Sequence, residues 1–102
     1  MIKVNIKREN KKVYEIVIKG HADYDTLGKD IVCSAVSSIV TTTINGIISI
    51  DNVAISYNYK NDKMTITNLK KDEITDKLLN NMLDLLKSLA KDYPKNINVK
   101  ES

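Results

Sequence analysis

The sequence predicts an α+β domain in which one β-sheet is covered by two helices. Two observations support this fold class. Apolar and polar residues alternate in two pairs of short segments, and a longer segment with helical spacing follows each pair. The expected order is ββαββα, a two-layer arrangement of a sheet and two packed helices, with a short edge strand at the C-terminus. We expect a single domain over residues 1–102, since this length can bury its own core.

The first two strands are predicted to form a hairpin around a polar turn at residues 9–11. Apolar side chains occupy alternate positions of each strand, so one face of the pair should cover the core. These positions are Ile2, Val4 and Ile6 before the turn, and Tyr14, Ile16 and Ile18 after it.

Residues 31–49 are predicted to form the first helix, although their Ile, Val and Thr content favours a strand. Polar residues recur there every three or four positions, which places them on one helical face, and a strand of this length would be unusual. The polar face holds Ser34, Ser38, Thr41, Asn45 and Ser49, and the opposite face holds Val32, Val36, Ile39, Val40, Thr43 and Ile47.

A second hairpin is predicted around a turn at residues 60–63. Its alternating apolar positions are Val53, Ile55, Tyr57 and Tyr59 before the turn, and Met64 and Ile66 after it. Tyr57 and Tyr59 share one strand face, so we expect them in the core or at an interface.

The second helix is predicted to begin at residues 71–73 and to end before Pro94, which bars its continuation. Ile97 and Val99 then supply the expected edge strand. The apolar positions at helical spacing are Ile74, Leu78, Met82, Leu85 and Leu89.

Composition limits the location and the partners that we expect. A single cysteine cannot form an internal disulfide, which fits a reducing cytoplasm. The N-terminus lacks the apolar core of a signal peptide, and we expect no apolar stretch that approaches the ~20 residues needed to span a bilayer. The net charge of +3 is too small and too dispersed to indicate nucleic-acid binding. We therefore expect a cytoplasmic protein without a membrane or direct nucleic-acid partner.

The one cysteine and the one histidine are the candidates for chemistry. His21 follows the strand that ends in Gly20, and Cys33 lies three residues after Asp30, which has the residue type of a helix N-cap. The amides and the dipole of a first helical turn favour an anion, so Cys33 lies where a thiolate is stabilised. We expect the same amides to bind the oxyanion that forms when the thiolate attacks a carbonyl.

The residues alone leave other roles open for this pair. A lone cysteine among apolar neighbours is often a small buried side chain, and a reactive one can instead be a redox sensor. Asp30 can also be a helix cap and nothing more. A metal site is not expected, because Cys33, His21 and the nearby Asp23, Asp25 and Asp30 match no regular ligand spacing.

Two motifs resemble the ribosomal-processing cysteine protease family called Prp. They are Gly20-His21-Ala22 and Gly28-Lys29-Asp30-Ile31-Val32-Cys33-Ser34-Ala35-Val36-Ser37. The family pattern is Gly-His-Ala, a loop, and then Gly-x-Asp-Ile-Val-Cys-x-Ala-Val-Ser. Length and element order also agree, so the resemblance covers nearly the whole chain.

The resemblance implies a homodimeric cysteine endopeptidase, without a cofactor, that removes the N-terminal extension of large-subunit ribosomal protein twenty-seven after an aromatic-rich segment. It implies that Cys33 is the nucleophile and that His21 is the general base and then the acid. The supporting residues expected beside this pair are Asp30, Ser37, Gly20 and Ser34. The alternative is a non-catalytic ribosome-associated binding or assembly module in which Cys33 is structural.

Two supporting residues have expected roles in this reading. Asp30 would anchor the helix start or orient His21. Ser37 lies one helical turn after Cys33, so its hydroxyl would reach the surroundings of the thiol.

The loop at residues 22–29 also has expected roles. It is polar and offers no evident apolar anchor, so we expect it to close over the bound peptide as a lid. Asp23 and Asp25 within it are expected to attract the basic flank of a ribosomal substrate.

Overall fold

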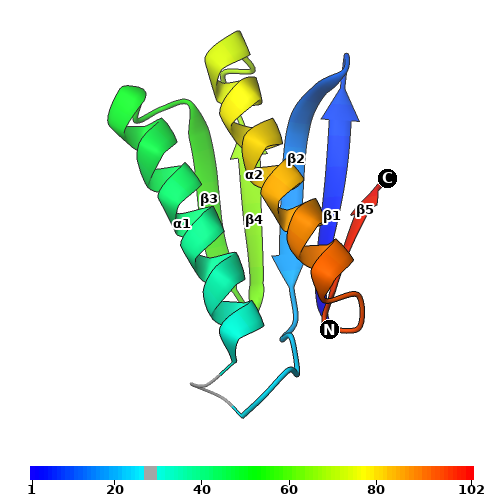
Figure 1. Cartoon of the computed structure of the whole chain (residues 1–102). Coiled ribbons are helices and arrows are strands. Elements are labelled where there is room, and N and C mark those ends of the chain that lie inside the picture. Colours follow the sequence, from blue (N-terminus) through cyan, green and yellow to red (C-terminus); the bar gives the residue numbers. More distant parts are fainter. Residues whose placement is uncertain (27–29) are drawn as a thin grey trace.

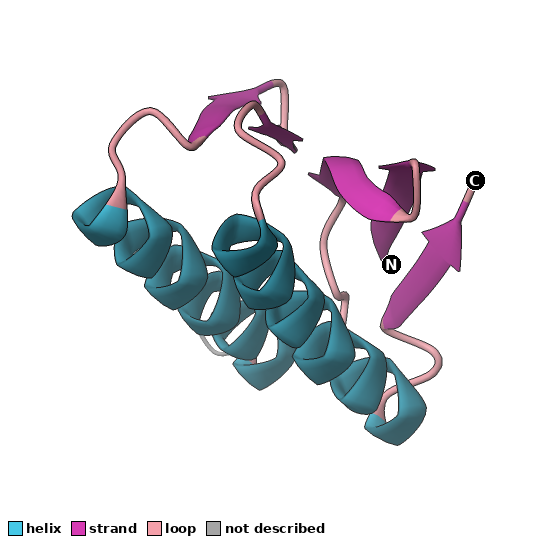
Figure 2. Ribbon diagram, turned by 90° about the horizontal axis from the view of Figure 1, so that it is seen from above, coloured by secondary structure: helices cyan, strands magenta, loops and turns pink. Residues whose placement is uncertain are grey.

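Both helices lie on the same face of a single mixed sheet, which gives the molecule two layers (Figure 1 and Figure 2). The computed structural model describes residues 1–26 and 30–102, and within these ranges the chain forms five strands and two helices. The elements are β1 (Ile2–Glu9), β2 (Lys12–Lys19), α1 (Ile31–Ile50), β3 (Ile55–Lys60), β4 (Lys63–Asn68), α2 (Glu73–Asp92) and β5 (Ile97–Glu101).

The strands are arranged in the order β3-β4-β2-β1-β5. Neighbouring strands run antiparallel except for β5, which pairs parallel to β1 at the edge of the sheet. The predicted α+β class, the ββαββα order and the C-terminal edge strand are thus confirmed. Because β4 lies beside β2, the turn of the second hairpin reaches the end of β2, where the site is built.

The first hairpin contains a bulge that the sequence pattern did not predict. Lys7 pairs with Glu15 and Arg8 with Val13, so Tyr14 is an extra residue in β2. Val13 is fully buried, whereas Tyr14 is half-buried. The prediction that Tyr14 lies in the core is therefore wrong, because the bulge reverses the alternation at this point.

Helix α1 has the predicted bounds to within one residue at its C-terminal end, and the predicted polar face is exposed. Its interior face differs slightly from the prediction, because Ile44 is buried while Ile39 and Thr43 are half-buried at the edge of the contact. The buried residues are Val32, Val36, Val40, Ile44 and Ile47.

By length and composition alone, α1 could span a membrane, since it has 20 residues with a mean hydropathy of 1.7. The expectation that no stretch approaches this length is therefore wrong. In the fold, the buried side chains of α1 join the core cluster between the helices and the sheet, which is the arrangement of a core helix.

Helix α2 buries a different stripe from the one predicted. Of the predicted residues only Met82 is fully covered, while Ile74 and Leu85 are 56% and 47% exposed. The helix has two adjacent apolar stripes, and contact with α1 and the sheet selects between them. The buried residues are Thr75, Leu79, Met82, Leu83 and Leu86.

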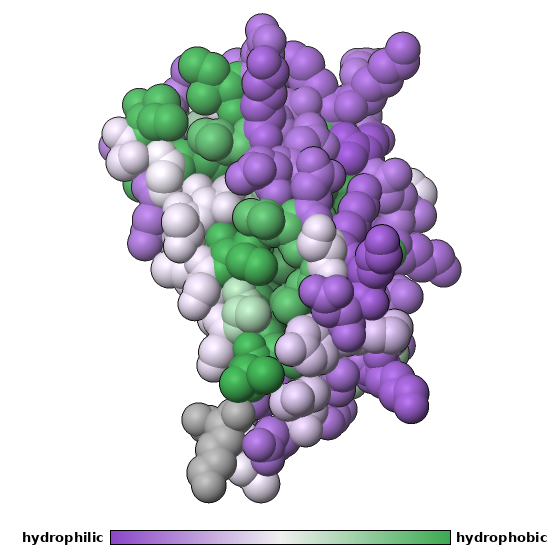
Figure 3. Space-filling view, viewed as in Figure 1, coloured by the Kyte–Doolittle hydropathy of each residue, from purple (hydrophilic) through white to green (hydrophobic). Residues whose placement is uncertain are grey.

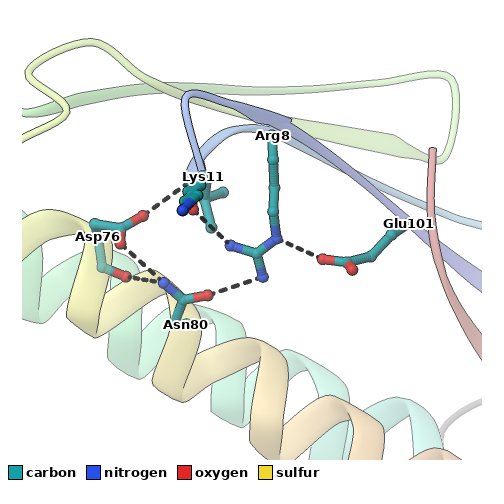
Figure 4. A network of polar contacts seen from close by, with 6 residues as sticks. Arg8, Lys11, Asp76, Asn80 and Glu101 are labelled. Carbon is teal, nitrogen blue, oxygen red and sulfur yellow. Dashed lines mark hydrogen bonds and ion pairs between the residues drawn. The ribbon is translucent and has the colours of Figure 1, made fainter.

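A polar network fixes α2 against the far end of the first hairpin (Figure 4). Arg8 donates from Nε to Glu101 Oε1 at 2.6 Å and from Nη2 to Asn80 Oδ1 at 3.0 Å. Asp76 Oδ1 accepts from the Val13 N–H at 2.8 Å. The hydrogen bond and charge of Arg8 hold the pKa of Glu101 below its usual value. These contacts join β1, β2, α2 and β5, and they help to set the rotation of α2.

The second hairpin turns at Asn61 and Asp62, which both have positive φ, as residues of a tight hairpin turn do. Tyr57 and Tyr59 share a face, but they are 51% and 66% exposed because β3 is an edge strand that the helices cover only at one end. Of their two expected places, the core is therefore excluded, and an interface stays a prediction. Val53 precedes β3 and is also exposed, since the strand begins later than the alternation indicated.

Candidate active site

The loop between β2 and α1 brings His21 and Cys33 to the same place. Both side chains line the same two cavities. The backbone N–H of Ala22, the residue after His21, donates to Cys33 Sγ at 3.3 Å. A thiol and an imidazole that are separated in sequence thus line common cavities where α1 begins.

Gly20 is required by the backbone just before His21. It has a φ of +92°, and a Cβ built on it would lie 2.4 Å from the carbonyl oxygen of Met1. Only glycine fits both conditions without a shift of the backbone. Gly20 therefore supports the site by allowing the backbone path that places His21.

Asp30 joins the start of α1 to the loop before it. Its Oδ1 accepts from the N–H groups of Val32 and Cys33 at 2.9 and 3.0 Å, and its Oδ2 accepts from the Tyr24 N–H at 3.0 Å. The side chain is buried, which opposes ionisation, but the backbone donors outweigh this and hold the pKa of Asp30 below its usual value. Of its two expected roles, anchoring the helix is the one that these contacts show.

One part of the expected chemistry is wrong. The N–H groups of Val32 and Cys33 were expected to receive an oxyanion, but both donate to the carboxylate of Asp30. The Ser34 N–H donates to the Asp30 carbonyl oxygen at 3.1 Å. An N-cap side chain and an oxyanion compete for the same backbone N–H donors, and in this structure the Asp30 carboxylate accepts from both of them.

The described part of the loop has anchors that the sequence did not indicate. Ala22 is fully buried, and its carbonyl oxygen accepts from Asn96 Nδ2 at 3.0 Å. The ring of Tyr24 packs edge-on against Tyr93, with ring centres 5.5 Å apart. The expectation of a loop without apolar anchors is therefore wrong for residues 22–26. Residues 27–29, which include Gly28, lie outside the described residues, and closure over a peptide stays a prediction.

An apolar cavity and a polar one meet at the candidate pair. The apolar cavity has a volume of about 210 Å³, and the polar one has a volume of about 620 Å³. His21, Cys33 and Ser37 line both, whereas Gly20 lines only the apolar cavity and Ser34 only the polar one. The thiol is thus accessible from two sides.

The two cavities differ in the chemistry of their walls. Side chains of α1, β1, β2, β3 and β4 enclose the apolar cavity, and three aspartates line the polar cavity. The further apolar lining residues are Ile2, Ile18, Val36, Val40, Tyr59 and Met64, and the aspartates are Asp23, Asp25 and Asp30. An extended peptide that crosses Cys33 would place an apolar side chain on one side and a basic one on the other.

Sequence reasoning missed one residue at this site, Asp62. Its Oδ2 lies 3.8 Å from His21 Nε2, and the residue lines the apolar cavity. Asp62 is a turn residue far from both motifs, and only the pairing of β4 with β2 brings it to His21. Within residues 1–26 and 30–102, no group of three or more His, Cys, Asp and Glu side chains is placed to hold a metal ion.

A thiol and an imidazole on the wall between two cavities define the class of site that thiol hydrolases use. The comparisons with known proteins agree with this class. The profile of the cysteine protease Prp family matches residues 1–98. A curated relative from Staphylococcus aureus strain Mu50, the ribosomal processing cysteine protease Prp, is 29% identical over 104 residues and covers 95% of each chain.

Two solved structures of the S. aureus ribosomal processing protease Prp are also similar. One, in complex with a covalently linked product peptide, is 27% identical with a TM-score of 0.94. The other, in complex with a substrate peptide, is 26% identical with a TM-score of 0.87. In both cases the match covers 100% of each chain. The chain belongs to the cysteine protease Prp family and is a cysteine protease. This membership favours an enzyme over the non-catalytic module and the redox sensor.

Proposed function

We propose that this protein is a cytoplasmic endopeptidase that removes the N-terminal extension of large-subunit ribosomal protein twenty-seven, with Cys33 as nucleophile and His21 as general base and acid. The single observation that carries the proposal is that Cys33 and His21 line the same two cavities, as a nucleophile and its base must. The S. aureus relatives support the reaction, since one structure holds a covalently linked product peptide and the other a substrate peptide.

The proposed reaction has two stages. In the first, Cys33 loses its proton to His21, its sulfur bonds to the scissile carbonyl carbon, and the C–N bond breaks as His21 passes the proton to the leaving amine. In the second, water attacks the thioester with His21 as base, the C–S bond breaks, and the thiol is restored. No step needs a cofactor or a metal ion.

The two cavities suggest how the precursor binds. The family resemblance implies cleavage after an aromatic-rich segment, and the apolar cavity of about 210 Å³ lies directly beside Cys33. We place an aromatic side chain of the extension there. Asp23 and Asp25 on the other side of Cys33 would attract a basic flank of the substrate.

A supporting role for Ser37 follows from the same geometry. It lies one turn after Cys33 on α1 and lines both cavities, so its hydroxyl is within the space that a bound peptide would enter. Ser34 lines the polar cavity alone, where it would contact the substrate on the side of the two loop aspartates.

We also propose that the enzyme is a homodimer that needs no membrane and no direct contact with nucleic acid. Apolar residues gather over the helical layer in Figure 3. Ile74 and Leu85 of α2 are exposed. On the second hairpin, Tyr57 is exposed as well. Light scattering during gel filtration would give twice the chain mass for a dimer, and a monomer mass at micromolar concentration would contradict it.

The test of the activity is incubation of the protein with a precursor that carries the extension, followed by intact-mass analysis of the product. We expect one cut at the end of the extension by the wild type and none by C33A or H21A. T42A is the matched control, because Thr42 is an exposed residue of the same helix that lines neither cavity. Cleavage by C33A at the wild-type rate would refute the assignment.

A further inference from the structure

Asp62 and Tyr59 extend the candidate pair into the β3–β4 hairpin. Asp62 Oδ2 lies 3.8 Å from His21 Nε2, and its other oxygen, Oδ1, accepts from the Tyr59 hydroxyl at 3.4 Å. Tyr59, Asp62, His21 and Cys33 all line the apolar cavity. The carboxylate thus lies between a hydroxyl that holds it and the imidazole.

The backbone fixes this arrangement independently of the side chains. Lys63 pairs with Lys19 across the β2–β4 ladder, and the Gly20 N–H donates to the Asp62 carbonyl oxygen at 3.4 Å. The residue before His21 is therefore hydrogen-bonded to Asp62 itself. This short backbone connection keeps the Asp62 side chain near the imidazole of His21.

Other charged and titratable groups surround His21, but they have different partners. Asp23 Oδ2 accepts from the N-terminal amine of Met1 at 2.9 Å, and both oxygens of Asp30 accept from backbone N–H groups. In the part of the chain that the structure describes, Asp62 is the one carboxylate within 4.0 Å of a ring nitrogen of His21. The titratable groups that share the two cavities with His21 are Tyr59, Asp62, Asp23, Asp25, Asp30 and Cys33.

We propose that Asp62 is a positioning residue for His21: its carboxylate, 3.8 Å from Nε2, attracts that side of the ring and leaves Nδ1 to serve the thiol. The proton of Cys33 then moves to Nδ1, while the Nε2–H of the resulting imidazolium stays toward Asp62. When the amide C–N bond breaks, the proton on Nδ1 passes to the leaving amine. A carboxylate that orients the base and stabilises its charged form is the part that the third residue plays in other hydrolase triads.

The solvent exposure of His21 and Asp62 determines how much the carboxylate can affect the reaction rate. The side chains of His21 and Asp62 are 56% and 67% exposed, so water screens their interaction. We therefore expect loss of the carboxylate to slow the reaction by about three- to fivefold, the upper end of what an exposed ion pair supports, and not by the several orders of magnitude of a buried triad.

Two variants and a matched control test the inference. D62G removes the side chain at a position where φ is +58°, which glycine tolerates, and D62N keeps an acceptor oxygen and also tolerates this backbone. N61G is the control, because Asn61 is the neighbouring turn residue with a φ of +55°. The inference rests on the proposed function for its kinetic test. D62G and D62N both remove the negative charge and should lower kcat about three- to fivefold with little change in KM, while N61G keeps at least half of the wild-type kcat.

A second measurement needs no substrate. Cys33 is the only thiol, so its rate of alkylation by iodoacetamide reports how well His21 assists its ionisation. D62G should slow alkylation about three- to fivefold in the wild-type background and change it less than about twofold in the H21A background. This separates the inference from the proposed function, because alkylation does not depend on the ribosomal substrate.

Three results would overturn the inference. The first is a kcat and an alkylation rate in D62G that equal those of N61G. The second is an equal slowing of alkylation by D62G with and without His21, which would show that Asp62 does not act through the imidazole. The third is a D62N variant with the wild-type kcat, which would show that the negative charge of Asp62 does not act on the base.

Discussion

Replacement of Gly20 by alanine should destabilise the fold and displace His21. The new Cβ would lie 2.4 Å from the carbonyl oxygen of Met1, and real Cβ atoms essentially never approach closer than 3.0 Å, so at least 0.6 Å (3.0 minus 2.4) must be gained by movement. The nearest atoms belong to backbone and not to the end of a flexible side chain. Relief therefore requires a shift of the start of β1 or of the chain before His21.

The loss of folding stability in G20A has two sources. A non-glycine residue in a rarely populated region such as φ +92° costs about 1–3 kcal/mol, and a close contact in a packed site adds about 1 kcal/mol or more. A total of about 2–4 kcal/mol is a large part of the stability of a small domain. At about 4–8 °C per kcal/mol for a chain of this size, Tm should fall by about 8–32 °C.

The assay is urea unfolding followed by circular dichroism, together with the thermal midpoint and cleavage of the precursor. G46A is the matched control, because a Cβ at Gly46 in α1 meets no atom within 4 Å. It should stabilise the protein by about 0.5–1 kcal/mol, the opposite sign, because alanine favours the helix. G20A should also cleave more slowly at temperatures where it is folded. A loss of stability below about 0.5 kcal/mol in G20A would refute the reasoning.

Two further predictions concern the aspartates of the site. Because the pKa of Asp30 is lowered in the fold, its carboxylate stabilises the protein above the ordinary aspartate value of 3.8, and this contribution is lost as the pH falls through the lower folded value. D30N should therefore have a lower urea midpoint than the wild type at pH 7, and the gap should close below pH 3.8; a gap that persists there would contradict the sign. D23N/D25N should raise KM for a precursor with a basic flank and weaken its salt dependence, whereas an unchanged KM at low and high salt would exclude the proposed attraction.

Local sequence patterns were sufficient to predict the strands and helices. They were also sufficient to place His21 after the second strand and Cys33 at the start of the first helix. The alternation in the hairpins, the periodic polar face of α1 and the N-cap at Asp30 depend on residues within a few positions of one another. Such short-range rules hold in any tertiary context, so the order of elements and the position of Cys33 in the first turn of α1 followed from the sequence. Resemblance to the family motif then indicated that His21 belongs with Cys33.

Where the local sequence pattern allowed more than one arrangement of side chains or strands, only the tertiary structure decided between them. The buried stripe of α2 depends on its contact with α1, and the bulge at Tyr14 depends on the pairing of β2 with β1. Asp62 reaches His21 only because β4 pairs with β2, a contact between residues about forty positions apart that no periodicity encodes. The sequence by itself thus indicated the thiol, the histidine proposed as its base and the helix that carries Cys33. The fold decided that Asp62 lies beside His21, because strand order and packing set contacts that local spacing does not.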